Sequence, residues 1–400
     1  MLVGLFLFYC HLFIRRSSPE LLLTIAFSQQ KRYNVLLFVF GFQNLVGSLV
    51  ILAAHPLCIL KNSGALSMSC NLAIAGVTGA VGQEFLKILE QRDFPFDSLK
   101  MLASSRSAGK KIEFKSKRYI VEQLTKNSFE RIDIALFSAG AARSKEFAPA
   151  AAKAGAVVVD NSSAFRMDPD VPLVIPEINP EQIQKHKGII ANPNCSTIIG
   201  IVPVWPLHKA NPVKRMVVST YQAASGAGMS AMLELENQTR EILDGKEPTC
   251  KAFPYQIAFN AFSHNSKLAP NGYNAEEMKM VNETRKIFDC ADIAITCTCI
   301  RIPVLRAHCE SINLEFADPI TPNQVRDLLS TAPGVSVLDD RENNRFPMPI
   351  DTSGKDDVFV GRIRQDESIP ENRGINLWVA GDQLRKGAAL NAVQIAEKLL

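Results

Sequence analysis

The sequence has little net charge and few histidines. Of its 400 residues, 44 are Lys or Arg, 40 are Asp or Glu, and only six are His. The small positive excess comes entirely from residues 1–70, whose only acidic residue is Glu20. Residues 71–400 therefore lack the basic bias that is typical of nucleic-acid binding, and we expect no nucleic-acid partner.

The cysteines lack the pattern of a secreted disulfide framework. There are nine of them, an odd number without regular spacing, in a chain long enough to bury its own core. We therefore expect mostly reduced thiols and an intracellular compartment. Cys297 and Cys299 share one face of an apolar run, but no second group of ligands stands near, so we expect no metal site.

Residues 1–70 are apolar and basic, and three interpretations remain open. Residues 35–54 carry no charge and are long enough to cross a bilayer, although Gln43 and Asn44 lie among them. The segment is a membrane anchor, a targeting segment that would place the protein in a plastid, or an upstream stretch wrongly joined to the gene, which would leave it cytoplasmic. Met68, directly before the first strand of a domain, favours the third interpretation.

From residue 71 onward, apolar strands alternate with helical segments. We predict strands at residues 72–75, 99–103, 133–138 and 156–160, and a helix at residues 141–154. This alternation predicts a parallel sheet covered by helices. After residue 200 the pattern changes to an α+β region with a mixed sheet and a final amphipathic helix. Its strands are expected at 215–221, 293–302, 311–316 and 375–380, and a polar helix at 275–288.

A glycine turn follows the first strand and carries the spacing GxxGxxG, from Gly76 to Gly82. It leaves a strand and opens a helix, where backbone N–H groups and the helix dipole can hold a pyrophosphate. About twenty residues on, NAD-binding folds place an acid that bonds the ribose 2′-OH. Here Arg106 and Ser107 stand instead. They can bind a 2′-phosphate, which favours NADP over NAD.

Cys195 is a candidate nucleophile. Residues 191–197 read Ala-Asn-Pro-Asn-Cys-Ser-Thr, which predicts a turn and a helix that begins at Cys195. The positive end of a helix dipole lowers the pKa of a thiol and favours the thiolate. His308 follows a strand that ends in Arg301, and the two can face one pocket. Spacing alone leaves open whether Cys195 and His308 are catalytic or structural.

Taken together, residues 71–400 resemble the aspartate-semialdehyde dehydrogenase family, in its plant and bacterial forms. The matching runs are residues 76–82, 105–110, 160–166, 192–197, 221–228, 276–279, 301–308 and 381–383. The family reduces L-aspartyl 4-phosphate with NADPH to L-aspartate 4-semialdehyde and phosphate. This is a step of lysine (diaminopimelate), threonine, methionine and isoleucine biosynthesis. Residues 1–70 have no counterpart in the resemblance.

The resemblance implies a Rossmann-like parallel-sheet NADP domain, made of residues 71–197 plus about 381–400. Residues 198–380 would form an α+β catalytic and dimerisation domain with a mixed sheet. The expected assembly is a homodimer or a dimer of dimers. A membrane partner is expected only if residues 35–54 are a real span.

The resemblance also implies a role for each motif residue. The catalytic set is Cys195, which forms an acyl thioester, His308, the general acid/base, and Gln222 and Asn194. The substrate-binding set is Arg301 for the carboxylate, Glu276 for the ammonium, and Gln222. The phosphate-binding set is Arg166 and Lys279. The NADP(H)-binding set is Gly76, Thr78, Gly79, Ala80, Val81, Gly82, Arg106, Ser107, Ser225, Gly226 and Gln383.

Two other hypotheses stay open at this point. The related reductase that acts on N-acetyl-glutamyl phosphate shares the fold and the chemistry, but its substrate has no free ammonium for Glu276. A membrane-tethered protein that binds NADP without turnover would use residues 35–54 as its anchor. The complete set of catalytic positions argues against this second hypothesis.

Overall fold

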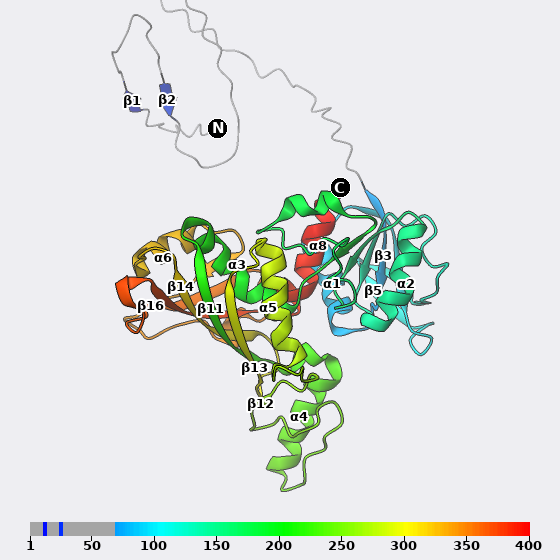
Figure 1. Cartoon of the computed structure of the whole chain (residues 1–400). Coiled ribbons are helices and arrows are strands. Elements are labelled where there is room, and N and C mark those ends of the chain that lie inside the picture. The colour runs from blue at the N-terminus through cyan, green and yellow to red at the C-terminus, as the bar shows by residue number, and fades with distance from the viewer. Residues whose placement is uncertain (1–10, 14–23, 27–68) are drawn as a thin grey trace, which may run out of the picture. The chain divides into compact units, whose positions relative to one another are not determined.

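A computed structural model describes residues 11–13, 24–26 and 69–400 of the chain (Figure 1). The possible span at residues 35–54 and the three interpretations of residues 1–70 lie outside the described residues, apart from two short paired strands, β1 (His11–Phe13) and β2 (Thr24–Ala26). In the described part of the chain, no helix combines the length and the apolar character that crossing a membrane would take. Residues 69–400 lie in one compact unit and are described by themselves below.

The first sheet has six strands, all parallel, in the order β10-β9-β8-β3-β4-β7. This confirms the predicted parallel sheet. The strands are β3 (Cys70–Ala75), β4 (Phe96–Ala103), β7 (Glu122–Gln123), β8 (Ile134–Phe137), β9 (Val157–Asp160) and β10 (Ile189–Ala191), and a hairpin of β5 (Lys111–Phe114) and β6 (Lys117–Ile120) follows β4.

Both faces of this sheet are covered. Successive side chains of a strand point to opposite faces, so the side chains pack in two clusters. Leu72 and Ile74 of β3 pack in one cluster with α1 (Ala80–Gln91) and the last helix, α8 (Leu390–Glu397). Ala73 and Ala75 pack in another cluster with α2 (Ala141–Lys153). The chain therefore returns to its first sheet at its C-terminal end, where α8 lies beside α1 (Figure 1).

The second sheet has seven strands in the order β12-β13-β11-β14-β17-β16-β15. Its strands are β11 (Val213–Gln222), β12 (Phe262–Ser263), β13 (Ala294–Arg301), β14 (His308–Phe316), β15 (Val335–Val337), β16 (Val358–Gln365) and β17 (Gly374–Gly381). The central strand β11 runs parallel to β13 and antiparallel to β14. The sheet is therefore mixed, as predicted.

Helices pack on the mixed sheet and share its core. They are α3 (Cys195–Ala210), α5 (Ala275–Phe288) and α6 (Pro322–Ser330). Two further helices, α4 (Met229–Leu243) and α7 (Pro349–Thr352), and the short helices η1 (Pro180–Lys185), η2 (Ala224–Ala227), η3 (Pro370–Asn372) and η4 (Arg385–Ala389) complete the fold. The sequence pattern predicts none of β10, β16, α4 and α6.

Candidate active site

The ends of three neighbouring strands meet at one edge of the mixed sheet. Gln222, the last residue of β11, pairs with Arg301, the last residue of β13. Tyr221 pairs with Cys309, so Gln222 and His308 also stand next to each other. All three side chains are buried. The start of α3 lies against this edge, and Cys195 Sγ is 3.6 Å from His308 Nε2.

The hydrogen bonds of His308 fix its tautomer. Nδ1 accepts a hydrogen bond from the backbone N–H of Ala223 at 3.0 Å. Because a backbone N–H can only donate, the neutral ring carries its hydrogen on Nε2, the atom that faces Cys195. Burial, and then the positive charge of Arg301, lower the pKa of His308 to about 3. The ring is therefore neutral in the unliganded site.

Helix α3 begins at Cys195, as predicted, because Asn194 caps it. Asn194 Oδ1 accepts hydrogen bonds from the N–H groups of Ser196 and Thr197, at 3.0 and 3.3 Å. The expectation of a lowered thiol pKa is not met in this unliganded site. Burial, and then Glu276, raise the pKa of Cys195 to about 12. Desolvation of the buried thiol outweighs the favourable effect of the helix dipole on the thiolate here.

Glu276 connects the side chains around Cys195. Its Oε1 accepts hydrogen bonds from Asn194 Nδ2 at 2.8 Å and Gln222 Nε2 at 3.3 Å, and its Oε2 pairs with Lys279 Nζ at 2.8 Å. Gln222 Nε2 also donates to Ser196 Oγ at 3.0 Å. Burial raises the pKa of Glu276, but Lys279 and His264 lower it more, so the pKa lies well below its usual value. The buried carboxylate is ionised.

Two polar atoms at the sheet edge have no partner within residues 69–400. They are Nε of Arg301 and Oε1 of Gln222, and both are buried. Arg301 Nη1 donates to the Ala223 carbonyl at 2.7 Å, which fixes the guanidinium. Buried groups of this kind in a native protein call for a partner. They can bind the polar groups of a ligand.

Arg166 is held by an ion pair and two further hydrogen bonds. Its Nη1 pairs with Glu283 Oε1 at 3.1 Å, Nε donates to the Asn192 carbonyl at 2.9 Å, and Nη2 donates to the Asn161 carbonyl at 2.7 Å. Each terminal nitrogen keeps one further N–H. Those two N–H groups are what Arg166 can offer to an anion.

One cavity of about 490 Å³ joins the candidate catalytic and cofactor residues. It is lined by Cys195, Gln222, Glu276, Lys279, Arg301, Arg166, Asn194, Gly79, Ala80, Val81, Ser225, Gly226 and Gln383, among others. The structure therefore brings the end of the mixed sheet and the glycine turn of the first sheet together. Of the predicted residues, His308 lies directly behind Cys195, and Arg106 and Ser107 lie on the loop after β4.

The glycine turn has the shape of an anion cradle. Gly76 has φ +92°, and a Cβ there would collide with the carbonyl of Ser138, while a Cβ on Gly82 would collide with the carbonyl of Gly76. A Cβ on Gly79 would lie 3.4 Å from the Gly76 carbonyl oxygen, which is ordinary van der Waals contact. Helix α1 has no side-chain cap and no acid in its first turn, so its first N–H groups remain available to a phosphate. The fit with a dinucleotide pyrophosphate is good.

The other predicted cofactor residues fall into two places. Thr78 Oγ1 lies 3.5 Å from Ser107 Oγ, which brings the glycine turn beside the loop that carries exposed Arg106. Ser225 and Gln383 bond to each other near His308, where Gln383 Oε1 accepts from Ala307 N–H at 2.8 Å. A Cβ on Gly226 would lie 3.2 Å from His308 Nε2, so Gly226 covers the ring.

Glu283 is a site residue that the sequence analysis missed. Besides pairing with Arg166, it accepts a hydrogen bond from the backbone N–H of Asn194 at 2.6 Å. It thus holds both Arg166 and the turn before α3. The sequence contains a pattern that indicates Glu283, because Glu276, Lys279 and Glu283 recur at helical spacing on one face of α5.

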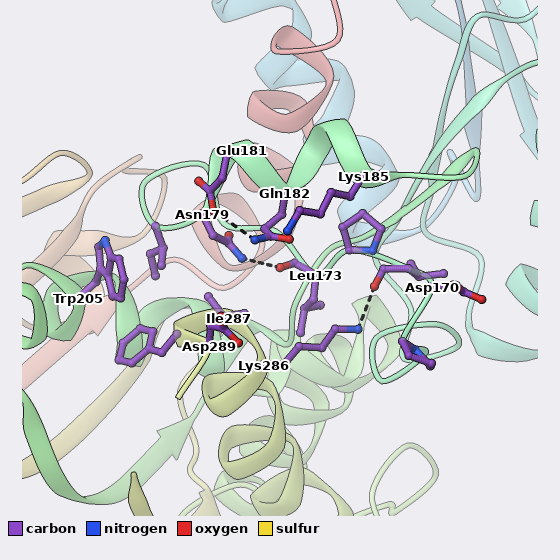
Figure 2. A pocket seen from close by; sticks show the side chains of 15 residues that line it. Asp170, Leu173, Asn179, Glu181, Gln182, Lys185, Trp205, Lys286, Ile287 and Asp289 are labelled. Atoms are coloured by element: carbon purple, nitrogen blue, oxygen red, sulfur yellow. Dashed lines mark hydrogen bonds between the residues drawn. The ribbon is translucent and has the colours of Figure 1, made fainter. Parts of the chain in front are cut away.

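A second cavity of about 330 Å³ contains none of the predicted site residues (Figure 2). It lies between η1, α3 and the end of α5. Lys286 at its border donates to the carbonyls of Arg166, Asp168 and Val171 at 2.7–2.9 Å. These bonds anchor the loop that follows Arg166, so Lys286 supports the active site from outside the first cavity.

Comparisons with known proteins agree with this geometry. Residues 71–186 match the family model of the semialdehyde dehydrogenase NAD binding domain, and residues 204–386 match that of the semialdehyde dehydrogenase dimerisation domain. The aspartate-semialdehyde dehydrogenase of Synechocystis is 56% identical over 329 residues, which are 82% of this chain and 97% of the relative. That of Aquifex aeolicus is 55% identical over 337 residues, 83% of this chain and 98% of the relative.

Solved structures agree as well. Aspartate semialdehyde dehydrogenase II of Vibrio cholerae, complexed with ASA, is 46% identical with a TM-score of 0.81, over 83% of this chain and 98% of that one. The enzyme of Candida albicans with NADP is 25% identical with a TM-score of 0.64, over 83% and 98%. A Rossmann-like NAD-binding sheet joined to a mixed sheet is the architecture of a semialdehyde dehydrogenase, an oxidoreductase. The chain belongs to the aspartate-semialdehyde dehydrogenase family, whose reaction serves amino-acid biosynthesis.

Proposed function

We propose that this chain reduces L-aspartyl 4-phosphate to L-aspartate 4-semialdehyde and phosphate with NADPH, on the route to lysine, threonine, methionine and isoleucine. The observation that carries the proposal is the Cys195–His308 pair, 3.6 Å apart, at the wall of a cavity that also contains the glycine turn. A nucleophile, a hydrogen-bond donor and an anion cradle at one cavity are what acyl transfer followed by reduction requires.

NADP(H) is the cofactor that the residues fit. The first turn of α1, from Gly79 to Gly82, would hold the pyrophosphate, and Arg106 with Ser107 would hold the 2′-phosphate. The structure of the Candida albicans relative with NADP supports this choice over NAD. When bound, the nicotinamide supplies the hydride for the reduction. Ser225, Gly226 and Gln383, next to His308, would orient the nicotinamide end.

The substrate's charged groups match the charges in the cavity. Arg301, with its free Nε, would bind the α-carboxylate. Ionised Glu276 would pair with the α-ammonium, and Gln222 and Asn194 keep that carboxylate in place. The remaining N–H groups of Arg166 and the ammonium of Lys279 would hold the phosphate as it leaves.

Cys195 and His308 would carry the covalent steps. The Cys195 sulfur attacks the acyl carbon, and phosphate leaves with the electron pair of the C–O bond and takes up the thiol proton, so that a thioester remains. After reduction, the oxyanion of the thiohemiacetal lies beside Nε2 of His308, which holds or supplies the proton there as general acid/base. Collapse of this species returns the thiolate and releases the aldehyde.

An aspartyl substrate is favoured over an N-acetyl-glutamyl one. Glu276 is buried, ionised and directed into the cavity region, and an acylated amine carries no charge to balance it. We also infer a homodimer, because residues 204–386 match a dimerisation domain.

The reverse reaction tests the proposal directly. The full chain is mixed with L-aspartate 4-semialdehyde and NADP⁺, and NADPH formation is followed with and without inorganic phosphate. The expected result is phosphate-dependent turnover, with N-acetyl-glutamate semialdehyde and NAD⁺ giving much lower rates. Folded protein that binds NADPH but gives no turnover with either aldehyde would overturn the proposal.

A further inference from the structure

The mixed sheet has a polar layer directly beneath the row that forms the active site. Two residues away from this sheet edge on each strand, Thr220 pairs with Cys299 on β13 and with Glu310 on β14. Because side chains repeat with a period of two, these residues face the same side as Gln222, Arg301 and His308. The next row down, which contains Val218 and Ile312, is apolar core. A single polar layer thus separates the cavity from the core.

The carboxyl group of Glu310 is completely buried in this layer and has no partner. Neither Oε1 nor Oε2 accepts a hydrogen bond within residues 69–400. The same holds for the hydroxyls of Thr220 and Thr197, which are also fully buried. Such groups in a native interior are normally satisfied by protein or by an ordered water.

Helix α3 closes the layer from above. A Cβ added at Gly200 would lie 2.5 Å from Glu310 Oε2, so the carboxyl group occupies the space that this glycine leaves. Thr197 is three residues earlier on α3 and therefore lies on the same face as Gly200. Thr197 also belongs to the first turn of the helix, which carries Cys195.

Among residues 69–400, no positive charge compensates Glu310. The groups that face it or border its layer come from three elements. They are Cys297 and Cys299 from β13, Glu277 and Met280 from α5, and Cys309 and neutral His308 on its own strand; Glu277 Oε1 accepts a hydrogen bond from the Cys299 N–H. Across β17 it pairs with Val379. Burial, and then Cys299, raise the pKa of Glu310 well above its usual value. A buried carboxylate without a partner is strongly unfavourable.

We propose that Glu310 is a neutral carboxylic acid that binds an internal water molecule together with Thr220 and Thr197, and that this layer positions the first turn of α3 and hence Cys195. Glu310 touches none of the reacting groups and is a positioning residue. The stability arm of the test below is independent of the proposed reaction. Only the turnover measurements of the positioning arm rest on the proposed reaction.

The stability arm compares the full chain with Glu310→Gln, a neutral isostere, between pH 5 and pH 9. The folded wild type keeps a proton that the unfolded chain releases, so its stability falls as the pH rises towards the pKa of folded Glu310. Relative to Glu310→Gln, the unfolding equilibrium constant of the wild type rises by up to about tenfold per pH unit. Ile312→Val, one row deeper, is the matched control and shifts stability equally at each pH. A pH-independent difference for Glu310→Gln would overturn the proposal.

The positioning arm measures the rate at which iodoacetamide alkylates Cys195, read from the mass of its peptide. Glu310→Gln is expected to keep the wild-type rate and turnover number within about twofold, because it retains the hydrogen bonds. Glu310→Met removes these hydrogen bonds. It is expected to change both the alkylation rate and the turnover number, with the KM for NADPH unchanged. Thr220→Val, a milder change, acts in the same direction, and its effect disappears in the Glu310→Met background. Additive effects, or a crystal structure without a water between these three side chains, would overturn the proposal.

Discussion

The two sheets supply the active site in different ways. At the end of the first sheet, the proposed ligand binding depends on backbone groups, namely the glycine turn and the free N–H groups of α1, and on an exposed cation, Arg106. At the end of the mixed sheet, it depends on buried side chains that bond to one another, such as Glu276 with Asn194, Gln222 and Lys279. The first arrangement fits any phosphate, whereas the second has to match the charges of one substrate.

This difference predicts how each half tolerates substitution. A side chain in the buried network has several partners, so its loss leaves other buried groups unsatisfied. A side chain on the cofactor loop has water as an alternative partner, so its loss is milder. Three substitutions test this contrast, in order of decreasing effect.

The largest effect is expected from Cys195→Ala. Without the thiol no thioester forms, and turnover falls by at least about 10⁴-fold. NADPH binding is retained, because the glycine turn is untouched. Steady-state kinetics and a fluorescence titration with NADPH measure the two properties. Cys250→Ala, at an exposed cysteine, is the control and keeps full activity. An active Cys195→Ala protein would contradict the proposed mechanism.

Glu276→Gln is expected to have an intermediate effect. It lowers kcat/KM and raises the rate at which Cys195 is alkylated. The loss of a buried charge that pairs with the substrate lowers kcat/KM by about 100-fold. At the same time the pKa of Cys195 falls, because Glu276 raises it, and alkylation of Cys195 at a fixed pH becomes faster. Lys279→Met removes a positive charge that lowers this pKa, so it slows alkylation. Alkylation rates that change in the same direction in both variants would refute this account.

The smallest effect is expected from Arg106→Ser. It removes a charge-assisted contact to the 2′-phosphate and raises the KM for NADPH by about tenfold. The KM for NADH stays unchanged, so the ratio of the two values is the measurement. Arg131→Ser, at another exposed position of the same sheet's loops, serves as control. An equal loss with both cofactors would mean that Arg106 acts on something other than the 2′-phosphate.

Local patterns in the sequence predicted the local parts of the site. The glycine turn, the start of α3 at Cys195 and the bounds of α5 all agree with the structure, because each depends on a few adjacent residues. Pairing across the fold was not predictable in this way. Arg306 bonds to Glu84 and Asp382, far away in sequence, and these ion pairs hold the loop before His308 against α1.

Glu310 shows a signal that was present but unused. It has the same parity along β14 as the inward residues Ile312, Leu314 and Phe316, so a strict period of two already assigns it to the buried face. An ionisable residue at an inward position contradicts the simple pattern. Such contradictions are expected near functional sites.

The return of α8 to the first sheet has a consequence for the order of synthesis. Lys386, fully buried just before this helix, bonds to Glu177, Asn391 and Gln394, and α8 covers one face of β3. The ribosome synthesises β3 more than 300 residues before it synthesises α8. The nascent parallel sheet therefore keeps one apolar face incompletely covered until α8 has been synthesised, so a sheet that begins early in the chain is completed late.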